Sequence, residues 1–184
     1  MEPIDGRWPP IYDADELAAT ISALVQRGVA ASQFYASVKR GPAVCQGDIF
    51  TLPSGVPVID ENGEPVAFGD ATYWLVIGNT CDFDRAIAEV AWTQAVPITN
   101  LGLEITPNEL SALTSYKYSR RFYLPPWDSG VVGHCVADFL RPVAVHKAVF
   151  GTQAVVTARL DRPAWILLHS CLIRFLARDD GRFA

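Results

Sequence analysis

A short polar stretch after an apolar run carries five different chemically active side chains. Residues 74–78 lead into Asn79, Thr80, Cys81, Asp82 and, after a gap, Arg85. Loops at strand ends are where a rigid scaffold displays reactive and binding groups. The stretch is therefore a candidate substrate- or partner-binding site, in which Asp82 is a candidate general base.

Two other interpretations of this stretch stay open. Asn79 and Asp82 are typical of turns, where their side chains accept hydrogen bonds from nearby backbone N–H groups. Cys81 would be a nucleophile if one of the chain's three histidines served as its base. No local signature of a known cysteine hydrolase surrounds Cys81, and an isolated cysteine is more often a small buried hydrophobe.

A second candidate site mixes basic and aromatic side chains between residues 116 and 127. Such a mixture suits phosphate contacts and base stacking on single-stranded RNA, which makes Tyr118, Tyr123 and Trp127 candidate binding residues. Arg120 and Arg121 are candidates for stabilising charge at a phosphoryl transition state. The alternative is a solvated strand edge whose basic residues discourage aggregation, and the acidic total charge favours it slightly.

Neither a metal nor a cofactor is expected. His134-Cys135 and His169-x-Cys171 offer soft ligands, but zinc sites normally space their ligands as C-x₂₋₄-C or H-x₃₋₅-H. Adjacent strand residues point to opposite faces, so His134 and Cys135 would not easily share one ion. No GxGxxG or Walker motif occurs, so a nucleotide-binding fold is not supported.

Helices are predicted at both ends of the chain. Asp13 and Glu16 form a capping-box pattern that opens an amphipathic helix ending near Gly28. A short helix is predicted over residues 30–39, closed by a Gly-Pro pair. Near the C-terminus Pro163 opens a last helix, whose predicted buried stripe is Leu168, Cys171, Leu172, Phe175 and Leu176.

Short strands are predicted between these helices. Asn62-Gly63 gives the strongest hairpin signal, and Thr106–Leu110 is typical of a helix start. Because the strands show no βαβ rhythm, the fold class expected is mainly β (α+β), a small partly open barrel. We expect residues 1–42 to form an N-terminal leader and helical extension and residues 43–184 the barrel with its C-terminal helix. The predicted strands cover residues 48–52, 56–59, 65–68, 73–77, 89–97, 121–124, 130–132, 137–140, 143–148 and 155–158.

The composition indicates a globular, acidic protein. Fifteen Lys plus Arg against twenty Asp plus Glu give a net charge of −5 over 184 residues, half of them apolar. This is a globular composition, and its acidity argues against broad non-specific binding to nucleic acid or anionic membrane. No apolar run reaches the ~20 residues of a membrane helix, and no signal-peptide pattern opens the chain. Four widely spaced cysteines predict free thiols in a reducing cytoplasm.

The order of several motifs resembles the PemK/MazF family of bacterial toxin endoribonucleases over roughly residues 45 to 150. Gly47–Phe50 is similar to that family's "GDI" strand, Trp74–Asn79 to its "PVVVIS" strand and Ala95–Thr99 to its "AAIT" strand. Val136–Lys147 resembles its later strand ending in "DK". The resemblance implies an SH3-like barrel, metal-independent RNA cleavage in a toxin–antitoxin setting, and a possible homodimer.

One departure bears on activity. Thr99 falls at the family's catalytic threonine, but residues 69–74 lack the family's catalytic arginine. The leading hypothesis is therefore RNA binding or metal-independent cleavage in which Thr99 positions phosphate and Arg120 or Arg121 replaces the missing arginine. In it Asp82 removes the proton from the 2′-OH.

The rival hypothesis is a non-catalytic barrel that binds a protein or a small ligand, as a sensor or an immunity- or antitoxin-like partner. Aromatic side chains and arginine are enriched at interface cores. The contact rim that this hypothesis predicts consists of Tyr116, Tyr118, Phe122, Tyr123 and Trp127.

Overall fold

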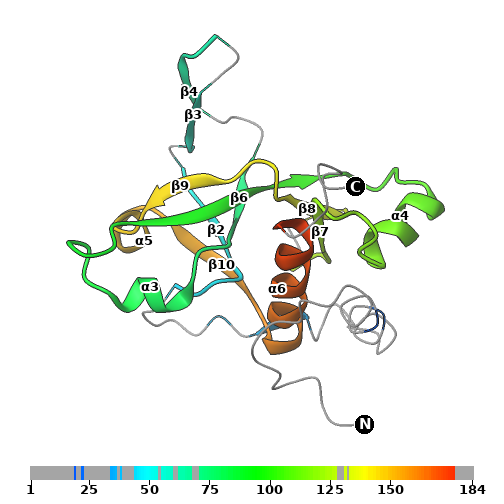
Figure 1. Cartoon of the computed structure of the whole chain (residues 1–184). Helices are drawn as coiled ribbons and strands as arrows, with labels where there is room; N and C mark the ends of the chain where they lie inside the picture. Colours follow the sequence, from blue (N-terminus) through cyan, green and yellow to red (C-terminus); the bar gives the residue numbers. More distant parts are fainter. Residues whose placement is uncertain are drawn as a thin grey trace, which may run out of the picture.

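The computed structural model describes residues 19, 22, 34–36, 38, 44–53, 55–59, 62–67, 71–127, 131 and 133–176. Eight antiparallel strands form a sheet that curls into a partly open barrel (Figure 1), in the order β1-β10-β2-β5-β6-β8-β7 with β9 also paired to β6. These strands are β1 Tyr35–Ala36, β2 Asp48–Thr51, β5 Tyr73–Val76, β6 Trp92–Asn100, β7 Arg121–Leu124, β8 Cys135–Asp138, β9 Val143–His146 and β10 Val155–Leu160.

Helices accompany the sheet at its ends and across one face. They are α3 Thr80–Asp84, α4 Pro107–Thr114, α5 Val149–Thr152 and α6 Arg162–Leu176. The predicted fold class, mainly β with a partly open barrel and a C-terminal packing helix, is confirmed. None of the helices in the described ranges is long and apolar enough to cross a membrane.

The long strand β6 pairs with two strands along one edge. Its first half, Trp92–Ala95, pairs with β9, whereas Ile98–Asn100 pairs with β8. Along its other edge β6 pairs with β5. One strand thus shares its edge between two partners, so the sheet splits along β6 and its two halves fold toward each other.

Two hydrophobic cores fill the two faces of the sheet. The larger core lies under α6, where Leu167, Leu168 and Cys171 pack against strand residues such as Ile98 and Phe122. The second core lies on the opposite face of β2, β5 and β6, beneath β9 and α5, and is centred on Phe50, Trp74 and Val145. Strand β5 is buried on both faces, which explains why it is a continuous apolar run and not an alternating one.

The predicted hairpin around Asn62-Gly63 is present. Strands β3 (Pro57–Ile59) and β4 (Pro65–Ala67) pair antiparallel as a separate two-stranded sheet that projects from the barrel (Figure 1). Gly63 has a φ of +83°, a conformation that glycine adopts without steric cost.

The prediction of a helix over residues 30–39 is wrong at its centre. Tyr35–Ala36 form β1, which pairs with Leu160 and Arg159 of β10. Tertiary contacts outweigh the helical spacing here: Phe34 is buried against Phe122, and the Tyr35 hydroxyl donates a hydrogen bond to Pro125 O over 2.5 Å. The predicted helix before Gly28 lies outside the described residues, apart from Ala19 and Ser22, which are helical.

Other predicted boundaries shift by a few residues. The strand predicted over 89–97 runs over Trp92–Asn100, and the one over 137–140 runs over Cys135–Asp138. Much of the strand predicted over 130–132 lies outside the described residues. Helix α4 begins as predicted, with Thr106 Oγ1 accepting from Glu109 N–H. In α6 the predicted burial of Leu176 is wrong, because its side chain is 77% exposed at the last turn.

Candidate functional site

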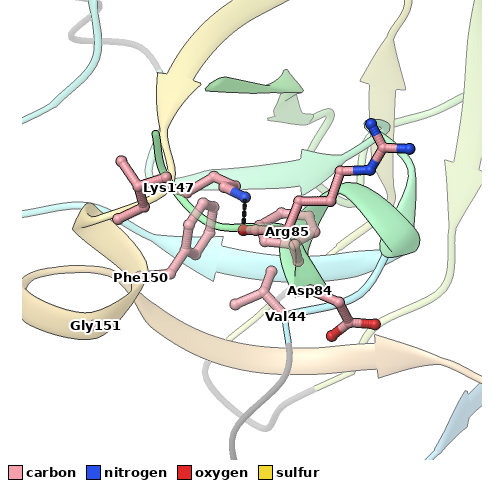
Figure 2. A pocket seen from close by; sticks show the side chains of 8 residues that line it. Val44, Asp84, Arg85, Lys147, Phe150 and Gly151 are labelled. Carbon is pink, nitrogen blue, oxygen red and sulfur yellow. Dashed lines mark hydrogen bonds between the residues drawn. The ribbon is translucent and has the colours of Figure 1, made fainter. Parts of the chain in front are cut away.

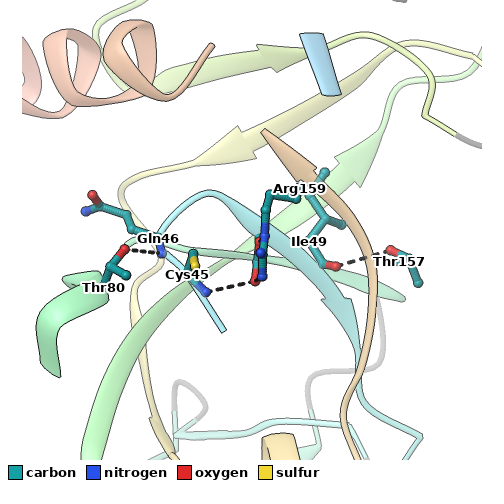
Figure 3. A network of polar contacts seen from close by, with 7 residues as sticks. Cys45, Gln46, Ile49, Thr80, Thr157 and Arg159 are labelled. Carbon is teal, nitrogen blue, oxygen red and sulfur yellow. Dashed lines mark hydrogen bonds and ion pairs between the residues drawn. The ribbon is translucent and has the colours of Figure 1, made fainter. Parts of the chain in front are cut away.

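Asp48, in the segment that resembles "GDI", holds the fold together at the start of β2. Its carboxylate is fully buried and accepts from Arg159 Nε over 2.6 Å, from Arg159 Nη2 over 2.8 Å and from Cys45 N–H over 2.8 Å. Figure 3 shows this network between β2 and β10. The hydrogen bond to Asp48 raises the pKa of Arg159 above its ordinary value. Asp48 therefore has a structural role.

Gln46 ties three further elements to the same turn. Its N–H donates to Thr80 Oγ1 over 3.0 Å, and its side-chain amide donates to Ile77 O over 2.7 Å (Figure 3). Its side-chain oxygen accepts from Trp165 Nε1 over 3.1 Å and from His169 Nε2, both on α6. Burial lowers the pKa of His169, which favours the neutral ring. Gln46 therefore joins α3, β5 and α6.

The predicted polar stretch at residues 79–85 forms helix α3. Asn79 stands at the N-cap, but its side chain makes no capping hydrogen bond, so the predicted side-chain cap is wrong there. Gly78 is required before it, because a Cβ at that position would lie 2.2 Å from Thr93 Oγ1. Thr80 is engaged with Gln46, whereas Cys81 is exposed and Asp82 is half-buried.

The lysine that ends the segment resembling the "DK" strand is buried and holds the end of α3. Lys147 is 7% exposed, and its ammonium donates to Asp82 O over 2.5 Å and to Arg85 O over 2.8 Å. The last carbonyls of a helix lack intrahelical donors, so a cation at this end satisfies them and suits the helix dipole. The exposed Arg85 side chain extends away from this ammonium (Figure 2).

Four of the other predicted site residues lie on or beside the outer face of β6, β8 and β7, namely Thr99, Tyr118, Arg121 and Tyr123. Thr99 of β6 lies opposite Val136 of β8, which in turn lies opposite Tyr123 of β7. His134 lies two residues before Val136, and residues two apart share a face. It is therefore a diagonal neighbour of Thr99, at about 7 Å between backbones. The Tyr123 hydroxyl and His134 Nδ1 are hydrogen-bonded over 3.1 Å. We call Thr99, Tyr118, Arg121, Tyr123 and His134 the outer-face cluster.

Two members of this cluster extend it toward the start of β7. Arg121 lies opposite Asp138 in the register, and its guanidinium carbon lies 5.9 Å from the centre of the Tyr118 ring. Tyr118 is 39% exposed. The exposed Arg120 precedes β7, and its carbonyl accepts from Phe139 N–H. A guanidinium stacked on an aromatic ring keeps its N–H groups directed sideways for an anion.

The two groups of candidate residues do not form one site. Ile77 and Gly78, just before α3, donate to Gln94 O near the start of β6, whereas Thr99 lies five residues further along the strand. At about 3.3 Å per residue this separation is on the order of 16 Å. Asp82 and Thr99 therefore do not act on one phosphate, and α3 lies at the other end of β6 from β7 and β8 (Figure 1).

No family model, no curated protein and no solved structure matches this chain.

Part of the aromatic rim predicted as a contact surface is buried. Tyr116 is 4% exposed and Phe122 is fully buried, so their prediction as rim residues is wrong. Trp127 packs edge-on against Tyr73, with ring centroids 5.1 Å apart, and against Tyr35. Only Tyr118 and Tyr123 of that set belong to the outer-face cluster. Phe122 and Tyr123 are adjacent in β7 and point to opposite faces, so the predicted rim combined side chains from two faces of the sheet.

Thiols and metal ligands are dispersed across the described part of the chain. Within it no three His, Cys, Asp or Glu side chains gather as a metal site would require. Burial raises the pKa of the Cys135 thiol to about 11 and that of Cys171 to about 12. Cys81 is exposed, and Cys45 is half-buried with its pKa raised chiefly by burial.

Sequence reasoning missed the roles of Gln46, Lys147 and His134. The sequence suggests His134 only as a partner of a cysteine or a zinc ion, because its approach to Tyr123 depends on the register of β7 against β8. Lys147 ends the segment that resembles the "DK" strand, but nothing local marks it as buried, since a lysine after a strand is ordinarily solvated. Both positions depend on contacts between strands that are distant in sequence.

Proposed function

We propose that this protein binds single-stranded RNA on the outer-face cluster and cleaves it without a metal ion. The observation that carries the proposal is the hydrogen bond between Tyr123 and His134, on the face of the sheet that also carries Thr99 and Arg121. The outer-face cluster thus combines His134 for proton transfer, Arg121 for binding phosphate, and the aromatic rings of Tyr118 and Tyr123. The resemblance to toxin endoribonucleases in the order of the motifs supports the same class of activity.

Local charge supports RNA binding despite the acidic total. Residues 117–121 and 138–141 together hold Lys117, Arg120, Arg121 and Arg141 against Asp138, a local balance of 4 − 1 = +3 on a chain of −5. The two segments adjoin, because Phe139 N–H donates to Arg120 O over 2.9 Å. Cationic side chains bind the phosphate backbone, and exposed rings such as Tyr118 stack on bases.

The hydrogen bond of His134 occupies Nδ1 and leaves Nε2 for proton transfer. With its proton on Nδ1 the ring donates to the Tyr123 oxygen, and Nε2 then presents a lone pair to the 2′-OH. Burial raises the pKa of Tyr123, so the hydroxyl stays a phenol. In this proposal His134 replaces Asp82 as the general base.

The chemistry balances without a metal ion. The 2′-oxygen forms a bond to phosphorus as Nε2 of His134 takes its proton, and the bond from phosphorus to the 5′-oxygen breaks. The departing 5′-oxygen takes a proton from water. Arg121 stabilises the charge on the non-bridging oxygens, and the Thr99 hydroxyl donates to one of them. The products are a 2′,3′-cyclic phosphate and a 5′-hydroxyl.

The test is cleavage of a mixed-sequence single-stranded RNA in EDTA by the unaltered protein and by His134→Gln. We expect cyclic-phosphate ends from the former and a rate lower by about 10²- to 10⁴-fold in the variant, as for loss of a general base. His146→Gln, at the other end of the sheet beside Trp92, is the matched control and should cleave normally. Equal cleavage by His134→Gln would contradict the proposal.

A non-catalytic binding module is the second candidate function, and Trp92 favours it. This side chain is 59% exposed and meets the His146 ring edge-on at 5.1 Å, and a large exposed aromatic side chain is typical of a contact surface. Under this alternative the RNA stays intact in EDTA. Trp92→Ala then weakens binding to a protein partner or to a second copy, the latter seen as a fall in mass by light scattering.

A further inference from the structure

A pocket lies between α3 and α5, at the opposite end of β6 from the outer-face cluster. Its volume is about 360 Å³, within the range of roughly 300–1,000 Å³ that small-molecule sites occupy. Its walls come from the α3 end on one side and from the β9–α5 junction on the other (Figure 2). The lining residues are Val44, Phe83, Asp84, Arg85, Ile87, Lys147, Phe150 and Gly151.

The apolar wall of this pocket is held in place by the second core. The rings of Phe83 and Phe150 meet edge-on with centroids 5.6 Å apart, and Phe150 also meets Phe50 at 4.9 Å. Phe50 is fully buried, so the two outer rings rest on a fixed base. A preformed apolar wall lets a ligand bind without the entropic cost of ordering side chains.

The polar end of the pocket is the ammonium of Lys147. An ammonium group has three N–H donors, and two of them are bound by the carbonyls of Asp82 and Arg85. Among the described residues Lys147 has no carboxylate partner. Lys147 is 7% exposed, and a buried charge is costly unless an opposite charge accompanies it. The third donor is thus available to an anion that enters the pocket.

The charges around the pocket set the charge of that anion. Arg85 and Lys147 against Asp84 give 2 − 1 = +1, which a single negative charge neutralises. The Asp84 and Arg85 side chains both point away from the ammonium (Figure 2), so Lys147 alone faces the interior. One ammonium donor suits one carboxylate oxygen, whereas phosphate is favoured by several donors or a planar fork.

We propose that this pocket binds a small monocarboxylate with an aromatic or branched apolar body. The carboxylate accepts from the third N–H of Lys147, and the apolar body packs on Phe83, Phe150 and Val44. Because the ammonium also holds the last carbonyls of α3, the bound carboxylate fixes the position of that helix. The inference is independent of the proposed RNA activity, since the two sites share no residue.

The test uses phenylacetate as the probe and its neutral isostere phenylacetamide as the comparison, followed by amide chemical shifts of the full chain. We expect phenylacetate to shift residues of α3 and α5 and to bind about tenfold more tightly than the amide, as for one charge-assisted hydrogen bond. Equal affinity for the two compounds would overturn the proposal. So would tighter binding of phenyl phosphate, or no shifts at about 10 mM phenylacetate, beyond which binding is too weak to be specific.

Variants at α5 separate the pocket from the rest of the fold. A Cβ added at Gly151 meets no atom within 4 Å, so this lining position has room for a side chain. Gly151→Leu adds bulk at the pocket edge and should abolish the shifts. The neighbouring exposed Thr152 lies outside the lining, and Thr152→Leu is the matched control that should keep them. Retained binding in Gly151→Leu would contradict the location. Lys147→Met should bind the two probes equally.

Discussion

The two ends of β6 carry polar residues of similar types that have different tasks. At the α3 end, Asp48, Gln46 and Lys147 are buried, and each holds backbone or side-chain partners from other elements. At the outer face, Arg121, Tyr123 and His134 lie half-buried on strands whose ladder is complete without them. Burial therefore distinguishes polar residues that maintain the fold from those that are available to a substrate.

This difference changes how the motifs are understood. Asp48 of the "GDI"-like segment stabilises the fold through its pair with Arg159. Residues 79–85, the polar stretch predicted as a site, are held by hydrogen bonds to Gln46 on one side and from Lys147 on the other. The residues best placed for chemistry come from β6, β7 and β8. The predictions below compare the two ends, beginning with the largest expected effect.

Substitution of the buried anchor should destabilise the fold most. Asp48→Asn removes the charge from a bidentate pair with Arg159, and breaking a buried pair costs about 3–5 kcal/mol. We expect about 3 kcal/mol in the free energy of unfolding, because the Arg159 side chain is 29% exposed and can turn toward water. Urea denaturation measures the loss. Asp84→Asn, an exposed carboxylate at the same end, should change stability by less than about 0.5 kcal/mol.

Substitution at the outer face should change binding and leave stability intact. Arg120→Gln with Arg121→Gln should weaken the affinity for single-stranded RNA about tenfold. It should also reduce the slope of log affinity against log salt by about 1.4, as for two lost phosphate contacts. Fluorescence anisotropy at several salt concentrations measures both. The matched control is Arg85→Gln at the α3 end. A comparable loss of affinity in that variant would show that RNA binds at the α3 end of β6 and would contradict the prediction.

The free energy of unfolding should depend on pH through His169, which is hydrogen-bonded to Gln46 at the α3 end. Desolvation lowers the pKa of this ring in the folded state below its ordinary value of 6.5. The unfolded chain therefore binds more protons, and stability falls as pH falls below about 6.5, by at most about 1.4 kcal/mol per pH unit. His169→Gln should have a flatter stability profile than the unaltered protein between pH 5.5 and 6.5, by urea denaturation at each pH. Parallel profiles would show that His169 is not desolvated.

Thiol labelling gives the smallest effect and tests the register of β8. Cys135 is 1% exposed with its pKa raised to about 11, so at pH 8 it should stay unlabelled by a thiol reagent while the exposed Cys81 reacts fast. Mass spectrometry of the labelled peptides identifies each site. Fast labelling of Cys135 would mean a register slip of one residue, which turns His134 inward and removes the outer-face cluster.

The sequence predicted the elements better than the contacts among them. The Asn62-Gly63 hairpin, the Thr106 cap and the strand over Arg121–Leu124 follow from local turn, cap and alternation rules, and all three are present. Strand β1 escaped prediction because its two residues are extended only through pairing with β10, far along the chain.

The candidate site was predicted in part and for the same reason. Arg121, Tyr118 and Tyr123 were singled out by residue type and Thr99 by the family resemblance, but nothing local joins them. Asp82 was grouped with them although α3 lies at the other end of β6. His134 completes the cluster only through the pairing of β7 with β8. Side chains on one strand face can be predicted from alternation, whereas neighbours across strands require the register.

The most direct test of the central claim is to titrate isotope-labelled protein with a short single-stranded RNA and follow its backbone amide shifts. We predict that the largest changes fall on the outer face, at residues 97–99, 118–123 and 134–138, and that residues 79–85 change little. The largest changes at residues 79–85 and 147–151, with the outer face unmoved, would contradict the account.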